Sequence, residues 1–233
     1  MQQLLGIAVV LAWLAVVVAM ALLVRRLRPD QREWSRKVVH IGTGPVILLA
    51  WWLQIDRSVA LPAAALVTAA TALNHRLRVL PAVEDVGRHS YGTIAYGASI
   101  TALLALYWPQ QPLPVAAGIL VMAIGDGLAG LVGPVVRSPR WRLLGQGKSV
   151  AGTSCMAIAS LAALLALAAL ADASGMAAPT VPALLGIAAA ATALEQLSGY
   201  GIDNLSVPLA TALLWQLCSG AGLPSLIDPQ IRP

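Results

Sequence analysis

The sequence predicts an all-α protein, a polytopic bundle of transmembrane helices, and three observations support this class. Of its 233 residues, 58% are hydrophobic and only 11% are charged, whereas a soluble domain averages about 25% charged residues. Several apolar runs approach the roughly 20 residues that a helix needs to cross a bilayer. These runs consist mainly of Ala, Leu and Val and lack the alternation of a membrane β-barrel strand, so helices are expected.

Eight apolar segments follow one another along the chain, separated by short polar stretches. Seven spans are the alternative, because the second segment contains His40 and a Gly44–Pro45 pair and two others are short. No basic residue precedes the first segment, so we do not expect it to be a cleaved signal peptide. We expect one integral membrane domain over 1–233. The segments fall near 4–24, 38–53, 59–74, 91–108, 113–133, 150–171, 181–196 and 204–221.

The basic residues predict which side of the membrane each loop faces. Thirteen of the 15 Lys and Arg residues fall in three loops, and only Arg57 and Arg232 fall on the other side. By the positive-inside rule these loops are cytoplasmic and both termini lie outside. The net charge of +5 therefore indicates orientation and does not point to a nucleic-acid partner. The predicted cytoplasmic loops are 25–37, 75–90, 134–149 and, with few charges, 197–203.

Asp126 is the first candidate site residue. An ionisable group deep in an apolar helix costs about 2.5–3.5 kcal/mol on insertion scales, so it is functional by default. Asp126 lies in the inner half of the fifth segment, in a stretch with four glycines, 125–133. Glycines let the backbone approach a ligand closely. The alternative is that Asp126 caps a helix that restarts at Gly127.

The stretch 145–153, before and within the sixth segment, is a second candidate. Its Gly147-Lys148-Ser149 run precedes a helix, where backbone N–H groups and the helix dipole favour a phosphate. It is not a P-loop, because Arg142 stands where that motif requires glycine and no strand is expected before it. The alternative is that Lys148 is an ordinary basic residue that reaches the inner interface.

Three further patches lie beside the predicted cytoplasmic face. Arg36, Lys37 and His40 share one face of a helix and could bind phosphate, move a proton or simply anchor the interface. Glu195 ends the seventh segment, and Asp203-Asn204 begins the eighth, where a helix cap explains part of the pattern. The stretch 88–93 is best explained as a loop and a helix cap.

All five patches fall on one side, whereas polar residues placed at random would fall on both. This convergence predicts a site where a phosphorylated, Mg²⁺-bound ligand from the cytosol meets a molecule dissolved in the bilayer. An ion-coupled transporter is an alternative, because acids beside glycine-broken helices also mark transport sites. No inverted repeat is visible, however, and the polar groups gather at one face rather than at the midplane.

Four short motifs occur in order between positions 36 and 208, with a Tyr91-Gly92-Thr93…Tyr96 stretch among them. The motifs are Arg36-Lys37-x-x-His40, Gly125-Asp126-x-x-Ala129-x-x-x-Gly133, Gly147-Lys148-Ser149-x-x-Gly152-Thr153 and Asp203-Asn204-x-x-Val207-Pro208. Together they resemble the phytol kinase/dolichol kinase family of CTP-dependent polyprenol kinases, and the chain length is similar to the phytol kinase branch.

The resemblance implies phosphoryl transfer from CTP to an isoprenoid alcohol, phytol foremost or geranylgeraniol, farnesol or a polyprenol. It implies that Asp126 holds Mg²⁺, that Lys148 neutralises phosphate, and that His40 or a carboxylate such as Asp203 takes the alcohol proton. Glu195 and Asn204 are further candidates. The residues expected around the nucleotide and its phosphates are Arg36, Lys37, Gly125, Gly127, Gly133, Gly147, Ser149, Gly152 and Thr153.

The same Gly-Asp and Lys-Ser-x-x-Gly pair is similar to CTP:phosphatidate cytidylyltransferases, so a cytidylyltransferase acting on a phospholipid precursor is the alternative. Their signature is Lys-Thr-x-Glu-Gly, and here Ala151 stands at the acidic position. The polyprenol kinases often have Glu there too, so this departure counts against both readings. No organellar targeting signal is visible, so we expect a bacterial inner membrane, or a thylakoid-type membrane if the alcohol is phytol.

Overall fold

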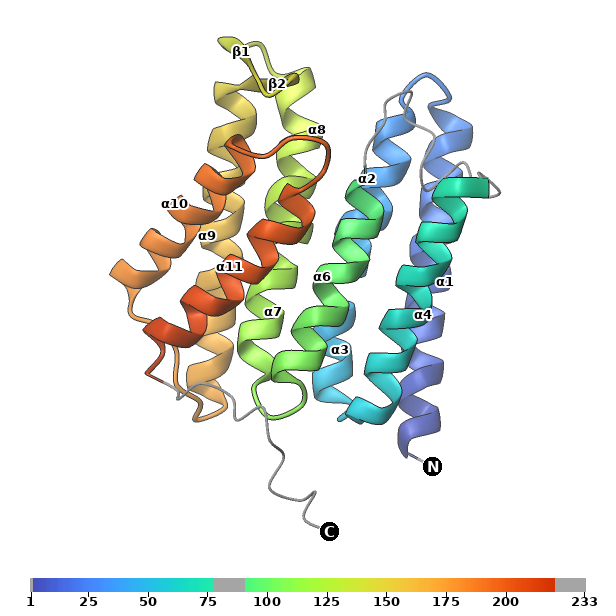
Figure 1. The fold of residues 1–233 in the computed structure, drawn as a ribbon, viewed down its shortest axis with the longest axis vertical. Helices are drawn as coiled ribbons and strands as arrows, with labels where there is room; N and C mark the ends of the chain where they lie inside the picture. The colour runs from blue at the N-terminus through green and yellow to red at the C-terminus, as the bar shows by residue number, and fades with distance from the viewer. Residues whose placement is uncertain (1, 78–90, 221–233) are drawn as a thin grey trace.

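A computed structural model describes residues 2–77 and 91–220, which form a helical bundle with one short hairpin (Figure 1). The strands β1 (Arg140–Leu143) and β2 (Gln146–Ser149) pair antiparallel. The helices are α1 (Gln2–Leu27), α2 (Arg32–Thr43), α3 (Val46–Trp52), α4 (Arg57–Leu77), α6 (Gly92–Tyr107), α7 (Pro112–Leu120), the π-helical turn η1 (Val121–Asp126), α8 (Gly127–Val135), α9 (Val150–Ala173), α10 (Val181–Gln196) and α11 (Asp203–Cys218).

Each of the eight predicted apolar segments coincides with one helix or with consecutive helices. The second segment is divided at the Gly44–Pro45 pair, because α2 ends at Thr43 and α3 begins at Val46. Among the described residues, four helical stretches are long and apolar enough to cross a membrane: α1, α4, Pro112–Val135 and α9. The number of spans and the side on which the termini lie stay predictions.

Two predicted loops contain regular structure. The loop at 25–37 is shorter than expected, because α1 runs to Leu27 and α2 already begins at Arg32. The stretch 134–149, predicted as a cytoplasmic loop, contains β1 and β2, so the expectation that no strand precedes the Gly-Lys-Ser run is wrong. Leu144 and Gly145 link the strands with φ angles of 50° and 77°, as in a two-residue hairpin turn. Most of the loop predicted at 75–90 lies outside the described residues, because these omit 78–90. The first three residues of the candidate stretch 88–93 lie outside them too.

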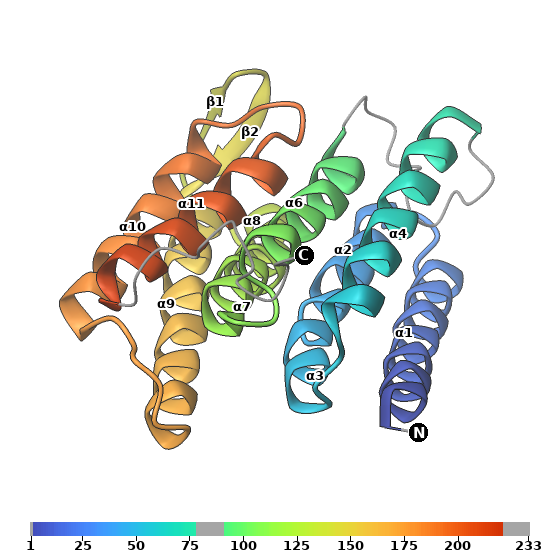
Figure 2. The same ribbon diagram turned by 60° about the horizontal axis from the view of Figure 1, so that its bottom comes forward.

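The connections that carry the predicted cytoplasmic loops share one end of the bundle. Figures 1 and 2 place the α1–α2 connection, the hairpin and the α10–α11 connection at this end, whereas α1 begins and α11 ends at the opposite end. This arrangement is the one that the distribution of basic residues requires, because all three connections were expected to face the same compartment.

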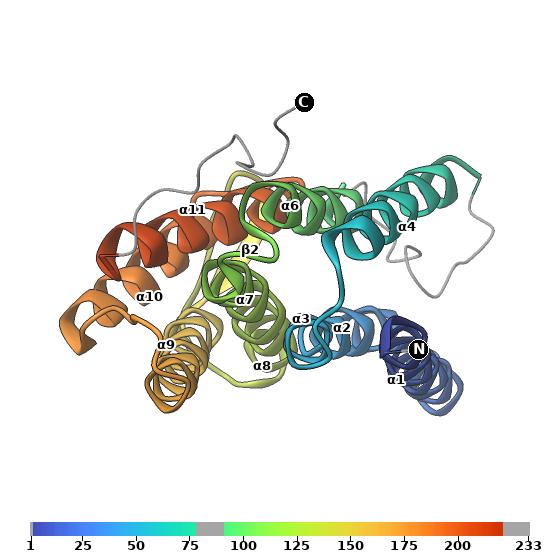
Figure 3. The ribbon, with the colours of Figure 1, turned by 90° about the horizontal axis from the view of Figure 1, so that it is seen from below.

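Helix α7 and its continuation through η1 and α8 form the centre of the bundle. Figure 3, which looks along the bundle, shows α7 and α8 in the middle and α1 and α4 on the outside. All nine residues of α7 are buried, and this helix packs against α11, α9, α6 and α3. Gly118 allows the close contact with α11, because a Cβ there would overlap the carbonyl oxygen of Pro208.

Candidate active site

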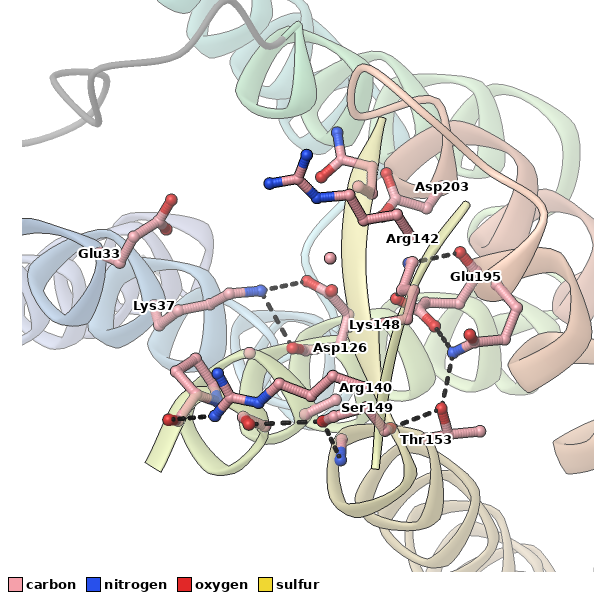
Figure 4. A pocket seen from close by; sticks show the side chains of 18 of the residues that line it. Glu33, Lys37, Asp126, Arg140, Arg142, Lys148, Ser149, Thr153, Glu195 and Asp203 are labelled. Atoms are coloured by element: carbon pink, nitrogen blue, oxygen red, sulfur yellow. Dashed lines mark hydrogen bonds and ion pairs between the residues drawn. The ribbon is translucent and has the colours of Figure 1, made fainter. Parts of the chain in front are cut away.

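A cavity of about 900 Å³ lies at the end of the bundle that carries the hairpin. The α1–α2 connection, α2, η1, α8, the hairpin, α9, α10 and the first residue of α11 contribute to its lining (Figure 4). Both acidic and basic side chains line it. The charged lining residues are Asp30, Glu33, Asp126, Glu195 and Asp203, and Arg36, Lys37, Arg140, Arg142 and Lys148.

Asp126 is the last residue of η1 and is bound by Lys37 of α2. The Lys37 ammonium donates to Oδ2 of Asp126 at 2.6 Å and to its carbonyl oxygen at 3.0 Å. Gly130 makes room for this lysine, because a Cβ at Gly130 would overlap the Lys37 side chain. Asp126 makes no side-chain cap hydrogen bond to α8, so the helix-cap alternative for this residue is wrong. Single π-helical turns inside helices are frequent at functional sites.

His40 lies behind Asp126 and does not line the cavity. Its Nε2 is 3.1 Å from the carbonyl oxygen of Met122 and 3.3 Å from Oδ2 of Asp126. Because both neighbours are acceptors, Nε2 carries the hydrogen and donates it. The ring packs against Tyr96 with 4.4 Å between centroids. The structure thus places His40 where it can orient Asp126, away from the space that a substrate would fill.

Lys148 of β2 and Glu195 of α10 form the second ion pair of the cavity. The Lys148 ammonium also donates to the Glu195 carbonyl oxygen at 2.9 Å. The other carboxylate oxygen, Oε2, accepts from Nε2 of Gln196 at 2.6 Å, and that amide also donates to Thr153 at 2.9 Å. Both oxygens of this buried glutamate are therefore occupied, and the pair joins the hairpin to α10.

Asp126, Glu195 and Asp203 bring three carboxylates together. One oxygen from each lies within 4.8 Å of the other two. Asp203 accepts hydrogen bonds only from Asn204, through Oδ1 at 3.1 Å, so among the described residues no cation pairs with it. Of these three carboxylates, only Asp126 and Glu195 are thus paired with a lysine. This donor set fits Mg²⁺, which prefers carboxylate and phosphate oxygens.

Ser149 and Thr153 shape the start of α9. Oγ of Ser149 accepts from the N–H of Gly152 at 3.1 Å, which is an N-cap. Oγ1 of Thr153 donates to the Ser149 carbonyl oxygen at 2.9 Å. Gly133 lets α8 approach α9, because a Cβ there would lie 3.3 Å from Cα of Gly152. The predicted helix start beside the Gly-Lys-Ser run is therefore present and lines the cavity.

The remaining predicted residues divide between the cavity and the helix contacts. Gly147 lines the cavity, and a Cβ there would meet nothing within 4 Å. Gly125 and Gly127 face neighbouring helices instead, because a Cβ would overlap Ser160 or Ile41 respectively. Asn204 is buried and is outside the cavity lining.

Arg140 and Arg142 of β1 line the cavity, although the sequence predicts for them only a role in orientation. Their alternation in Arg140-Trp141-Arg142, followed by Gly145, was a signal for a strand with both arginines on one face. Arg36 also lines the cavity, and it is paired with Glu33 of the same helix at 2.8 Å.

The fold and the site define a class: an apolar helical bundle with a charged, carboxylate-rich cavity at one end. The chain is 43% identical over 213 residues to a phytol kinase of Synechocystis sp., covering 90% of this chain and 91% of the relative. It therefore belongs to the phytol kinase-like family of polyprenol kinases.

More distant relatives are named for the same kind of reaction. The chain is 28% identical to a probable phytol kinase 2, chloroplastic, of Oryza sativa subsp. japonica, over 80% of this chain and 66% of the relative. It is 31% identical over 143 residues to a farnesol kinase, chloroplastic, of Arabidopsis thaliana, over 56% of this chain and 46% of the relative. No family model matches the chain, and no solved structure does.

Proposed function

We propose that this protein is a membrane kinase that transfers a phosphoryl group from CTP to the hydroxyl group of an isoprenoid alcohol, with phytol as the first candidate. The observation that carries the proposal is the 43% identity to a phytol kinase over 90% of the chain. The farnesol kinase among the relatives supports the broader class of linear isoprenoid alcohols. These names favour a kinase over the cytidylyltransferase and the transporter.

The position of the cavity suits a reaction between a nucleotide from water and an alcohol from the bilayer. Charged residues line it at one end of a bundle whose outer helices, α1 and α4, expose apolar side chains. A lipid tail can lie along such helices while its hydroxyl group reaches the polar end. Phosphoryl transfer requires mainly positioning and neutralisation of charge, which the lysines and carboxylates of the cavity can supply.

Asp126 is the proposed ligand of Mg²⁺. Its Oδ1 makes no hydrogen bond with the described residues, while Lys37 and His40 hold Oδ2. A bound Mg²⁺ would neutralise phosphate oxygens and would take its other ligands from phosphate and water. Lys37 keeps the carboxylate in place and shields it from solvent on the α2 side.

Asp203 is the proposed acceptor of the alcohol proton. It lines the cavity, and its Oδ2 makes no hydrogen bond with any described residue. His40, the other candidate, lies behind Asp126 and already donates through Nε2. Because a general base has to reach the proton that it removes, the geometry favours Asp203.

The test is a labelling experiment with purified protein in lipid vesicles. CTP and ATP labelled at the γ-phosphate are each offered with phytol, geranylgeraniol, farnesol and a long polyprenol. We expect labelled phytyl phosphate, formed faster from CTP than from ATP. Lys148→Ala and Asp203→Asn should each lower the rate at least about tenfold, because each removes a charge from the reacting groups.

The same preparation tests the alternatives. Phosphatidate is offered with CTP labelled at the α-phosphate, and we expect no labelled lipid. If no alcohol is labelled from either nucleotide, the kinase proposal is wrong. If phosphatidate acquires the CMP moiety, the cytidylyltransferase takes its place.

We further propose a bacterial inner membrane, or a thylakoid-type membrane, with the cavity facing the cytoplasm. The cyanobacterial relative and the basic connections at one end support this orientation. The test replaces Cys155 and Cys218, the two cysteines, by alanine and introduces Leu144→Cys at the exposed hairpin tip. A membrane-impermeant thiol reagent should modify this cysteine in inverted vesicles and not in intact cells.

A further inference from the structure

Arg142 stands apart from the other basic residues of the cavity. Lys37, Lys148 and Arg36 are each paired with an acid. Arg140 donates to the carbonyl oxygen of Pro134, at the end of α8, at 2.9 Å. The Arg142 side chain makes no hydrogen bond or ion pair with any residue that the structure describes, and Figure 4 shows its guanidinium extending from the hairpin over the cavity.

The register of the hairpin leaves the arginine face open. Arg140 and Arg142 are two residues apart on β1 and therefore point to the same face. Their cross-strand partners are small: Ser149 opposite Arg140, and Gly147 opposite Arg142. A Cβ at Gly147 would meet nothing within 4 Å, so nothing crowds this face near Arg142.

The hairpin is held in place at its root, its middle and its tip. At the root, the N–H of Val150 donates to the Pro139 carbonyl oxygen at 3.0 Å. In the middle, Lys148 is paired with Glu195 of α10. At the tip, Leu144 packs against the α10–α11 connection, where a Cβ at Gly199 would lie 3.3 Å from the Leu144 carbonyl oxygen. A binding group on such an anchored strand is preorganised and loses little freedom when it binds a ligand.

We propose that the arginine face of the hairpin, with Arg142 as its principal group, binds the β- and γ-phosphates of the nucleotide donor. This proposal rests on the kinase function given above. The two lysines of the cavity already neutralise carboxylates, so the extra negative charge of a nucleoside triphosphate needs further cations. An arginine with all its donors free binds phosphate through two parallel hydrogen bonds. Arg140 contributes less, because the Pro134 carbonyl oxygen already takes one of its donors.

The test measures equilibrium binding of CTP, CDP and CMP, with Mg²⁺, to the purified protein in phosphatidylcholine nanodiscs. For Arg142→Gln we expect the affinity for CTP to fall at least about tenfold, the affinity for CDP to fall less, and the affinity for CMP to stay unchanged. The affinity of Arg142→Lys for CTP should lie between those of wild type and Arg142→Gln, because an ammonium cannot bind phosphate through a planar pair of donors. Arg142→Lys also provides the test of the proposal if Arg142→Gln does not fold.

Arg137→Gln is the matched control. Arg137 is an exposed arginine at the same end of the bundle, between α8 and β1, and it does not line the cavity. We expect wild-type affinity for all three nucleotides. A general effect of surface charge would instead weaken binding equally in both variants.

Three outcomes overturn the inference, and they can be told apart. If wild type binds CTP and Arg142→Gln binds it equally well, or loses CTP and CMP equally, the phosphate role is wrong while the kinase proposal stands. If the affinity of Arg142→Gln for CTP falls below that of wild type only after anionic lipid is added to the nanodiscs, Arg142 recognises lipid phosphate instead. If wild type binds no nucleotide, both proposals fail.

Discussion

Helix α4 and the central run Pro112–Val135 are both long and apolar enough to cross a membrane, yet α4 lies on the outside of the bundle and the central run in its middle. In the most apolar 18-residue window of each, 67% of the central run is buried inside the protein, against 6% of α4. The central run carries Gly118, Gly125 and Gly127, at each of which a Cβ would overlap a neighbouring helix. Apolarity thus allows a helix to enter a membrane, whereas small residues allow neighbours to surround it.

The largest expected effect concerns the acid of the central run. Asp126→Asn should lower the rate of alcohol phosphorylation at least about a hundredfold, because it removes the charge that faces Lys37 and the proposed Mg²⁺. The control is Asp172→Asn, at the exposed end of α9, for which we expect wild-type rates. If Asp126→Asn and Asp172→Asn phosphorylate the alcohol at equal rates, the acid at the centre of the bundle matters no more for the reaction than an acid at its periphery.

The next effect concerns packing. Gly118→Ala should lower the free energy of unfolding by about 1–3 kcal/mol, because its Cβ would overlap the backbone of Pro208. Gly186→Ala in α10 is the control, since a Cβ there meets nothing within 4 Å. It should raise stability by about 0.5–1 kcal/mol. Denaturant unfolding in detergent measures both, and a stable Gly118→Ala protein would contradict close packing as the reason for the central position.

His40 tests how the centre positions its acid. His40→Asn should lower the phosphorylation rate about tenfold and weaken Mg²⁺ activation, because Oδ2 of Asp126 and the Met122 carbonyl oxygen lose a donor. A residue that acted as general base would instead remove the dependence of the rate on pH. The pH profile at saturating Mg²⁺ therefore separates the two roles, and we expect its shape to be retained.

The smallest effect is expected on α4. Leu66 is 71% exposed within the protein, so Leu66→Ala should change the free energy of unfolding by less than about 0.5 kcal/mol. Leu164→Ala on α9, where the leucine is fully buried, should cost about 2–5 kcal/mol. Equal losses in a detergent unfolding experiment would show that α4 packs against something that the isolated chain lacks.

Much of the fold could be predicted because it depends on local composition. The eight apolar segments coincide with helices, and the Gly44–Pro45 pair that made the second span uncertain lies between α2 and α3. The hairpin was missed because its turn begins with Leu144, which is not a favoured residue at positive φ. Its strands have only four residues each, and exposed positions give them little hydrophobic pattern.

The candidate site could be predicted residue by residue but not contact by contact. Asp126, Lys37 and Lys148 are candidates from the sequence alone, because ionisable groups near apolar helices are costly wherever they occur. Their pairing could not be predicted, since Lys37 and Asp126 are 89 positions apart and Lys148 and Glu195 are 47 apart. His40 was predicted for this site from its motif, but its place behind Asp126 depends on how α2 packs against η1.

The sequence by itself determined the class of the protein, the order of its helices and the set of charged residues that need an explanation. Transfer of an apolar or charged side chain into lipid has a free energy that depends mainly on the side chain itself. Only the tertiary structure decided which lysine meets which carboxylate, which glycines serve packing, and that the Arg142 side chain has no partner among the described residues. Those outcomes depend on distances of a few ångströms between helices, because hydrogen bonds and ion pairs weaken steeply when their geometry is lost.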